Sequence, residues 1–166
     1  MCGCVAQMRK VLAQLITKYD KKTVTVNLET GGSETGILKS IYHNPTTGGL
    51  LVLANATGAN KCAVSICHIA SVTIPGESYD TSITYLPTPS PLPEGCDTDC
   101  EEAVRSALPV GTSKVNLKAG GKSLGSGTVL KNVYGMLVLV NSGNKNPSFV
   151  SACKVEVIDE EKEIIV

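Results

Sequence analysis

The residues of this chain whose types and spacing could do chemistry are its cysteines. There are seven of them in 166 residues. Four lie before or within the two segments expected to be helical, and we call them the leader cysteines: Cys2, Cys4, Cys96 and Cys100. The other three lie where the fourth strand of each copy of an internal repeat is expected: Cys62, Cys67 and Cys153. An odd count leaves at least one thiol free or shared between chains.

Three interpretations of the cysteines remain open. Cys67 and Cys153 fit small core residues, since free cysteines are usually buried. The four leader cysteines could form a thiolate zinc site, although neither of their spacings, Cys-x-Cys and Cys-x-x-x-Cys, is the usual one. If the leader cysteines are exposed, they could instead cross-link chains through disulfides in an oxidising environment.

No pattern of residues points to catalysis. A cysteine nucleophile would need a histidine base, and the only histidines are His43 and His68. Cys67 and His68 are neighbours, and neighbouring side chains of a strand point to opposite faces. Phosphate-loop, dinucleotide-binding and HExxH patterns are absent. We therefore expect a protein that is not an enzyme and needs no cofactor.

Charge and composition limit the partners. The 15 basic and 15 acidic residues give zero net charge, so that the chain gains little from counterion release on phosphates. With no Trp and one Phe, it has few side chains for base stacking. No apolar run approaches the roughly 20 residues of a membrane span, and no signal-peptide pattern is present. We expect a soluble protein made in the cytoplasm, without a membrane or nucleic-acid partner.

An internal repeat organises the chain. Four blocks of the first copy, residues 26–32, 38–42, 49–55 and 64–69, recur in the same order as residues 115–121, 130–134, 135–141 and 150–155. Their spacing changes only in stretches rich in Gly, Asn, Pro and Thr, where loops accept insertions. The chain therefore consists of two copies of one small module.

The pattern within the first copy predicts five short strands. They are expected at residues 23–28, 37–42, 50–54, 63–69 and 71–74, and the third is apolar enough to be buried on both faces. The last two follow each other almost directly and should bend into one another, as in a small closed sheet. Apolar residues at helical spacing predict a helix over residues 5–19, and acids after a capping Asp97 or Thr98 predict a shorter helix ending at Leu108.

These elements predict a mainly β protein with two tandem five-stranded small barrels, each with an N-terminal helix. The first module would span residues 1–75 and the second residues 96–166. Residues 76–95 contain Pro87, Pro89 and Pro91, which predict an extended, semi-rigid linker.

The strand residues also carry a family pattern. In the first copy it consists of Val24, Val26, Leu28, Gly31, Gly36 and Leu38. In the second copy it consists of Val115, Leu117, Gly120, Gly127 and Val129. In this pattern the chain resembles the Sm-like family, which includes the Lsm proteins and Hfq. The resemblance implies Sm-like barrels with unpaired edges at strands four and five, whose edge-to-edge pairing builds rings or open arrays.

The Sm-like resemblance also implies an alternative function, RNA binding. Its candidate residues are His68, Lys39, Lys131 and Lys154. The family carries a base-binding Asn before strand three. Residues 43–49 of the first copy and Gly135 of the second depart from that pattern.

A looser resemblance is to spore-coat proteins of the CotB type, which have a Thr-Val-Thr-Val strand, a glycine pair and a Gly-x-Leu strand in tandem. It implies an assembly role, with deposition in a spore coat or similar layer. Our leading hypothesis is therefore a structural protein that assembles with itself, with other structural proteins as further candidate partners, and is cross-linked by its leader cysteines. The C-terminal residues 156–166 could add a strand or exchange one between chains.

Overall fold

The computed structural model describes residues 2–42 and 48–160. The first module contains α1 (Gly3–Lys18), β1 (Thr23–Leu28), β2 (Ser33–Tyr42), β3 (Leu50–Ala54), β4 (Asn60–Ser65), the 3-10 turn η1 (Ile66–His68) and β5 (Ile69–Thr73). The second contains α2 (Cys96–Ala107), β6 (Val115–Ala119), β7 (Lys122–Val133), β8 (Met136–Asn141), η2 (Ser142–Asn144), β9 (Lys145–Ser151), η3 (Ala152–Lys154) and β10 (Val157–Glu160). Element for element, η2 apart, the second module repeats the first.

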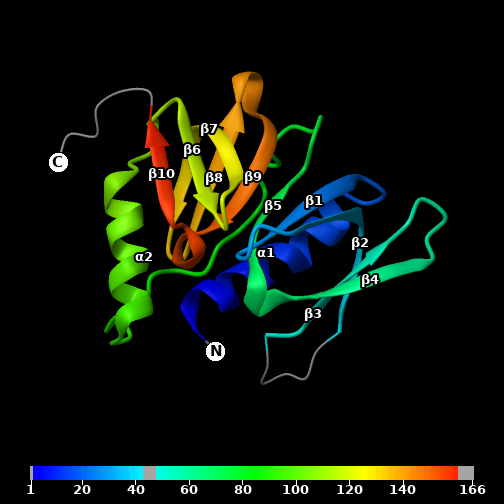
Figure 1. Cartoon of the computed structure of the whole chain (residues 1–166), viewed down its shortest axis with the longest axis horizontal. Helices are drawn as coiled ribbons and strands as arrows, with labels where there is room; N and C mark the ends of the chain where they lie inside the picture. Colours follow the sequence, from blue (N-terminus) through cyan, green and yellow to red (C-terminus); the bar gives the residue numbers. More distant parts are fainter. Residues whose placement is uncertain (1, 43–47, 161–166) are drawn as a thin grey trace.

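All ten strands of the described residues belong to one antiparallel sheet (Figure 1). Its strand order is β10-β6-β7-β8-β9-β5-β1-β2-β3-β4. The predicted mainly β fold is thus confirmed, whereas the two closed five-stranded barrels are not found. Each module has the same internal order, but β5 pairs with β9 of the other module instead of closing on β4. The sheet stays open, with β4 at one end and β10 at the other; the module boundaries remain a prediction.

The predicted bend between the last two strands of each module is a single 3-10 turn. η1 separates β4 from β5, and η3 separates β9 from β10. The turns correct one part of the sequence interpretation, because Cys67 and Cys153 lie in η1 and η3 and not in a strand.

Strand β8 joins two hydrophobic cores. Met136, Val138 and Val140 belong to the core that contains α1, whereas Leu137 and Leu139 belong to a second core. Alternate residues of a strand face opposite sides of a sheet, so an apolar strand buried on both faces connects the two cores. We predicted this burial for β3, whose first residue Leu50 is instead exposed.

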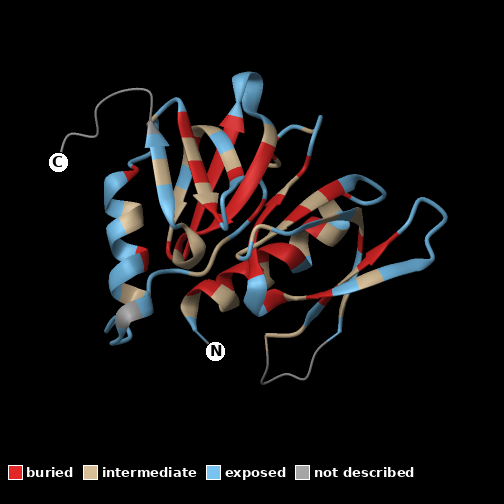
Figure 2. Cartoon of the chain, in the orientation of Figure 1, coloured by how far each residue is buried: buried red, intermediate tan, exposed pale blue. Residues whose placement is uncertain are grey.

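The two helices differ in how far they are buried. Helix α1 lies in the middle of the molecule and packs against β2 and η1 of its own module and against β8 and β9 of the other. Figure 2 shows α1 largely buried and α2 largely exposed on the outside. α2 packs mainly against η3 of its own module. Neither helix is long and apolar enough to cross a membrane, within the residues described.

The first part of the linker is packed, contrary to the prediction of an extended spacer. The Tyr79 backbone N–H donates to the Asn144 carbonyl oxygen over 2.8 Å, and the Tyr79 ring lies 6.2 Å from that of Phe149. The Thr84 backbone N–H donates to Gln14 Oε1 over 2.8 Å. The prediction of a spacer rested on proline content alone. It did not consider Tyr79, whose aromatic side chain is stabilised more by burial than by exposure in an extended linker.

Replacing Phe149 by Ala should destabilise the protein by about 3–5 kcal/mol, because its side chain is fully buried and its removal leaves a cavity. Chemical denaturation followed by circular dichroism would measure the loss. Phe149→Leu, which keeps most of the apolar volume, is the control and should lose less. Equal stability of Phe149→Ala and the parent would contradict the described core.

Candidate functional site

The two modules meet where β5 pairs with β9, and we call this pairing with its surrounding contacts the internal interface. The register places Ser71, Val72 and Thr73 opposite Val150, Phe149 and Ser148. The Thr73 and Ser148 hydroxyl groups hydrogen-bond to each other over 2.8 Å. The backbone N–H of Ile74 donates to the carbonyl oxygen of Pro147 over 3.0 Å. The edges of the two modules therefore satisfy each other's backbone groups.

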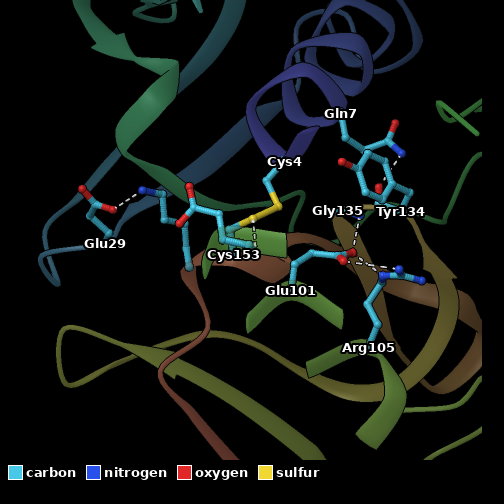
Figure 3. Close-up of a disulfide and its surroundings, with 10 residues drawn as sticks. Cys4, Gln7, Glu29, Glu101, Arg105, Tyr134, Gly135 and Cys153 are labelled. Carbon is cyan, nitrogen blue, oxygen red and sulfur yellow. Dashed lines mark hydrogen bonds and ion pairs between the residues drawn. A yellow bond between two sulfur atoms is a disulfide. The ribbon is translucent and has the colours of Figure 1, made fainter. Parts of the chain in front are cut away.

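A disulfide joins the modules beside this pairing (Figure 3). It links Cys4 in the first turn of α1 to Cys153 in η3, with their Cα atoms 6.2 Å apart. Cys4 is only 4% exposed. Since the two cysteines are 149 residues apart in sequence, the bond strongly restricts the unfolded chain.

Two buried polar side chains connect the helices to the turn between β7 and β8. Gln7 of α1 donates from Nε2 to the Tyr134 carbonyl oxygen over 2.7 Å and accepts the Leu86 backbone N–H over 2.8 Å. Glu101 of α2, 2% exposed, accepts the Gly135 backbone N–H over 2.6 Å. Both helices thus hold the same turn from different sides, as Figure 3 shows.

A carboxylate at the end of β1 lies between two basic residues. Glu29 accepts hydrogen bonds from Lys154 of η3 and, over 2.7 Å, from His68 Nδ1 of η1. The hydrogen bond from Lys154, with a further one from His68, lowers the pKa of Glu29 below its usual value. The contact to Lys154 crosses the internal interface. The structure therefore brings these two RNA-binding candidates together on one carboxylate, which forms an ion pair with Lys154 and a hydrogen bond with His68.

The other two RNA-binding candidates lie elsewhere on the sheet. Lys39 of β2 donates to the Gly58 carbonyl oxygen over 3.0 Å and to Asn60 Oδ1 over 2.7 Å. Lys131 is exposed on β7. Within the stretch that the family resemblance assigns to a base-binding Asn, residues 43–47 lie outside the described residues.

The structure decides between some of the interpretations of the cysteines. Cys67 and Cys153 are not core residues, because η1 and η3 turn the chain out of the strand; Cys67 is exposed and Cys153 is half-buried in its disulfide. Cys4 is bonded to Cys153 and not to another leader cysteine. Cys2 and Cys100 are free and exposed, and Cys96 is the first residue of α2.

Sequence reasoning did not single out Gln7, Glu29 or Glu101. Gln7 and Glu101 had a weak signal, because each is a polar residue on the face of a helix that otherwise carries apolar residues toward the core. Glu29 had none, since its two basic partners are distant in sequence and nothing local pairs them with it.

The outer edges of β4 and β10 have no strand partner among the described residues. A hollow of about 430 Å³ lies beside β4 and is lined by Leu28, Thr30, Glu34, Cys62, Ala63, Val64, Ser65 and His68. On β10, Val157 is 46% exposed. Both ends of the sheet thus have an outer edge without a strand partner among the described residues, with the exposed Val157 at one end and the hollow beside β4 at the other.

In the part of the chain that the structure describes, no group of three or more His, Cys, Asp or Glu side chains could hold a metal ion. Comparison of the chain with models of protein families, with curated proteins and with solved structures finds no match.

Replacing Glu29 by Gln should lower the free energy of unfolding at pH 7 by about 1 kcal/mol, the upper range for a partly exposed ion pair. Because folding lowers the pKa of Glu29, its contribution is complete above the unfolded pKa near 4.5 and is lost as the pH falls through the folded pKa. Denaturation curves from pH 7 to pH 3 would therefore converge for variant and parent. The exposed Glu102→Gln is the control; a constant difference at all pH values would exclude the ion pair.

Replacing Cys153 by Ser should lower the free energy of unfolding by about 2–5 kcal/mol, because the disulfide closes a long loop in the unfolded chain. Thermal unfolding with and without reductant would measure this, and reductant should shift the parent but not the variant. Cys62→Ser removes a thiol that is not disulfide-bonded and serves as the control. A parent insensitive to full reduction would contradict a stabilising bond.

Proposed function

We propose that this protein is a non-enzymatic structural subunit that assembles with itself, by pairing the β10 edge of one copy with the β4 edge of the next. The observation that carries the proposal is the internal interface, where an edge of one module already pairs with an edge of the other. The two edges left without a partner are the repeat counterparts of the two that pair. The same interaction can therefore continue from chain to chain.

The repeat gives the register of the proposed contact. Val64 and Ser65 of β4 correspond to Val150 and Ser151 of β9. By the same correspondence, Ser71, Val72 and Thr73 of β5 become Val157, Ile158 and Asp159 of β10. Transferring the observed β5–β9 register places Val157 opposite Val64, Ile158 opposite Ala63 and Asp159 opposite Cys62 of the next copy.

The apolar hollow beside β4 supports the same contact. In the second module, the positions that correspond to Leu28 and Val64 are Leu117 and Val150. Both belong to the second hydrophobic core, which also contains Ala70 of the first module's β5. At the internal interface the neighbouring strand thus supplies part of the core. Beside β4 that place is open, and the residue of the next copy that corresponds to Ala70 is Glu156, so the contact would cover the hollow without repeating the apolar packing of Ala70.

Charge favours unlike edges over like ones. The register places Lys61 of β4 opposite residue 160 of β10, which is a glutamate. Pairing two β4 edges or two β10 edges would instead bring like charges together, and like charges directly opposite each other destabilise a strand pair. A contact between two different surfaces closes into a ring or continues as an open filament.

Both family resemblances agree with an assembly role. The Sm-like resemblance implies free edges at the fourth and fifth strands of a module. We propose that each half is an Sm-like module whose fourth and fifth strands pair with neighbouring modules instead of closing a barrel. The resemblance to CotB-type proteins implies a layer such as a spore coat as the place of deposition. RNA binding is the weaker candidate, since Glu29 offsets the charge of Lys154 and hydrogen-bonds to His68.

Reversing the charge at one edge should weaken assembly, and reversing both should restore it. Lys61→Glu and Glu160→Lys each put like charges opposite each other, at a cost of up to about 1 kcal/mol, or a factor of about 5 in the dissociation constant. Light-scattering chromatography at low salt over a range of concentrations would measure the effect. The double variant should assemble like the parent.

Lys131→Glu makes the same charge change on the central strand β7 and should leave assembly unchanged. A parent protein that keeps the 17.3 kDa mass of one chain at all concentrations would overturn the proposal. Assembly that requires co-purified RNA, recognised by the ratio of absorbance at 260 and 280 nm, would favour the alternative function.

A further inference from the structure

Two exposed apolar side chains lie next to each other on the first module. Tyr42 of β2 pairs with Leu50 of β3, which puts both on one face of the sheet, and they are 73% and 38% exposed. The same places in the second module are held by Val133 of β7 and Met136 of β8, which also pair. Met136 is fully buried, and Val133 is half-buried against the core that contains α1. The second module thus has a cover on a face that the first module leaves open.

The next residue on this face of β3 follows the same rule. Leu51 and Leu53 belong to the core of their own module, so that Leu50 and Val52 lie on the opposite face of the strand. Val52 is half-buried, whereas its counterpart Val138 in β8 is fully buried. We call this surface the outer β3 face, and its members are Tyr42, Leu50 and Val52.

Helix α1 covers the corresponding surface of the second module. It packs against β8 and β9, and its Met8 lies in one core with Met136 of β8. Its first turn lies on the β7–β8 turn, since a Cβ atom on Gly3 would come 2.0 Å from the Tyr134 hydroxyl oxygen. Gln7 donates to the Tyr134 carbonyl oxygen. The cover of this face is therefore a helix that belongs to the neighbouring module.

The helix in the equivalent position for the next contact is α2. Helix α2 packs against η3 as α1 packs against η1, so each helix lies beside the turn that precedes the last strand of its module. The β5–β9 pairing brings α1 onto β8, the neighbour of β9. In a β10–β4 contact, β10 takes the place of β5 and β4 that of β9, which brings α2 onto β3 of the next copy. Figure 1 shows α2 and β10 at one end of the molecule and β3 and β4 at the other.

The exposed side of α2 contains a residue whose counterpart is covered. The last residues of α1 and α2 lie at the same distance before the repeated Val-Asn-Leu segment. On this alignment Cys100 of α2 corresponds to Val11 of α1. Cys100 is exposed, whereas Val11 is fully buried. Both surfaces of the proposed contact are thus open where their internal counterparts are closed.

We infer that the exposed side of α2 of one copy covers the outer β3 face of the next copy. The inference rests on the proposed function, because a β10–β4 contact is what brings the two surfaces together. A second copy of this chain is the occupant that the structure favours, since the chain already covers the same face of its second module with its own helix. Tyr42 and Leu50 then add side-chain burial to a contact made by backbone pairing.

Tyr42→Ala and Leu50→Ala should each raise the dissociation constant of the assembly about tenfold, a loss typical of a side chain that anchors an interface. Light-scattering chromatography over a range of concentrations would measure it, and circular dichroism would verify that each variant is folded. Val110→Ala is the control. Val110 is an exposed apolar residue in the loop before β6, and its counterpart Lys21 is exposed in the first module, so the contact should leave it uncovered.

The reactivity of the Cys100 thiol tests α2 as the covering element. A short pulse of N-ethylmaleimide, followed by peptide mass spectrometry, should label Cys100 readily in single chains obtained by dilution and several times more slowly in the assembled protein. A Lys131→Cys variant supplies a reference thiol on the central strand β7, which should react equally in both states.

The outcomes separate this inference from the proposed function. If Cys100 stays reactive in the assembly, or if Tyr42→Ala and Leu50→Ala assemble like the parent, the inference is overturned and the β10–β4 pairing still stands. A parent protein that remains as single chains at every concentration would refute both.

Discussion

The backbone hydrogen bonds between β5 and β9 determine how the rest of the molecule is arranged. A strand edge carries N–H and C=O groups that need partners, and here the last strand of one module and the fourth strand of the other satisfy each other. The pairing places Ala70 in the second module's core and Phe149 in the first module's core. A module of this size would be marginally stable alone, so each depends on the apolar surface that the other supplies.

The same pairing makes the two helices unequal. Helix α1 is covered by both modules, and its Val11 is fully buried. Helix α2 has no second module beside it, and Cys100, at the position that corresponds to Val11, is exposed. The internal interface thus covers α1, the edge of β5 and the edge of β9. Their repeat counterparts, which are α2, the edge of β10 and the edge of β4, stay exposed.

Sequence patterns located most strands and both helices, because alternation and helical spacing are local properties of the chain. They did not reveal the Glu29–Lys154 contact or that β5 pairs with β9 within one chain, because these contacts join residues far apart and leave no periodic signal. Only the family resemblance implied that fourth-strand and fifth-strand edges pair. Cys67 and Cys153 were misplaced because an apolar run continues through a 3-10 turn without a break in the pattern. The prediction of an extended linker considered its prolines and did not consider Tyr79, which is buried.

The covalent connection between the two modules affects the thermodynamics of any larger assembly. Because both modules belong to one polypeptide, the internal interface forms at a fixed effective concentration and does not respond to dilution. Only contacts between chains obey mass action. In the proposed assembly, modules would therefore be added in pairs, and a closed ring would contain an even number of modules because each chain contributes two.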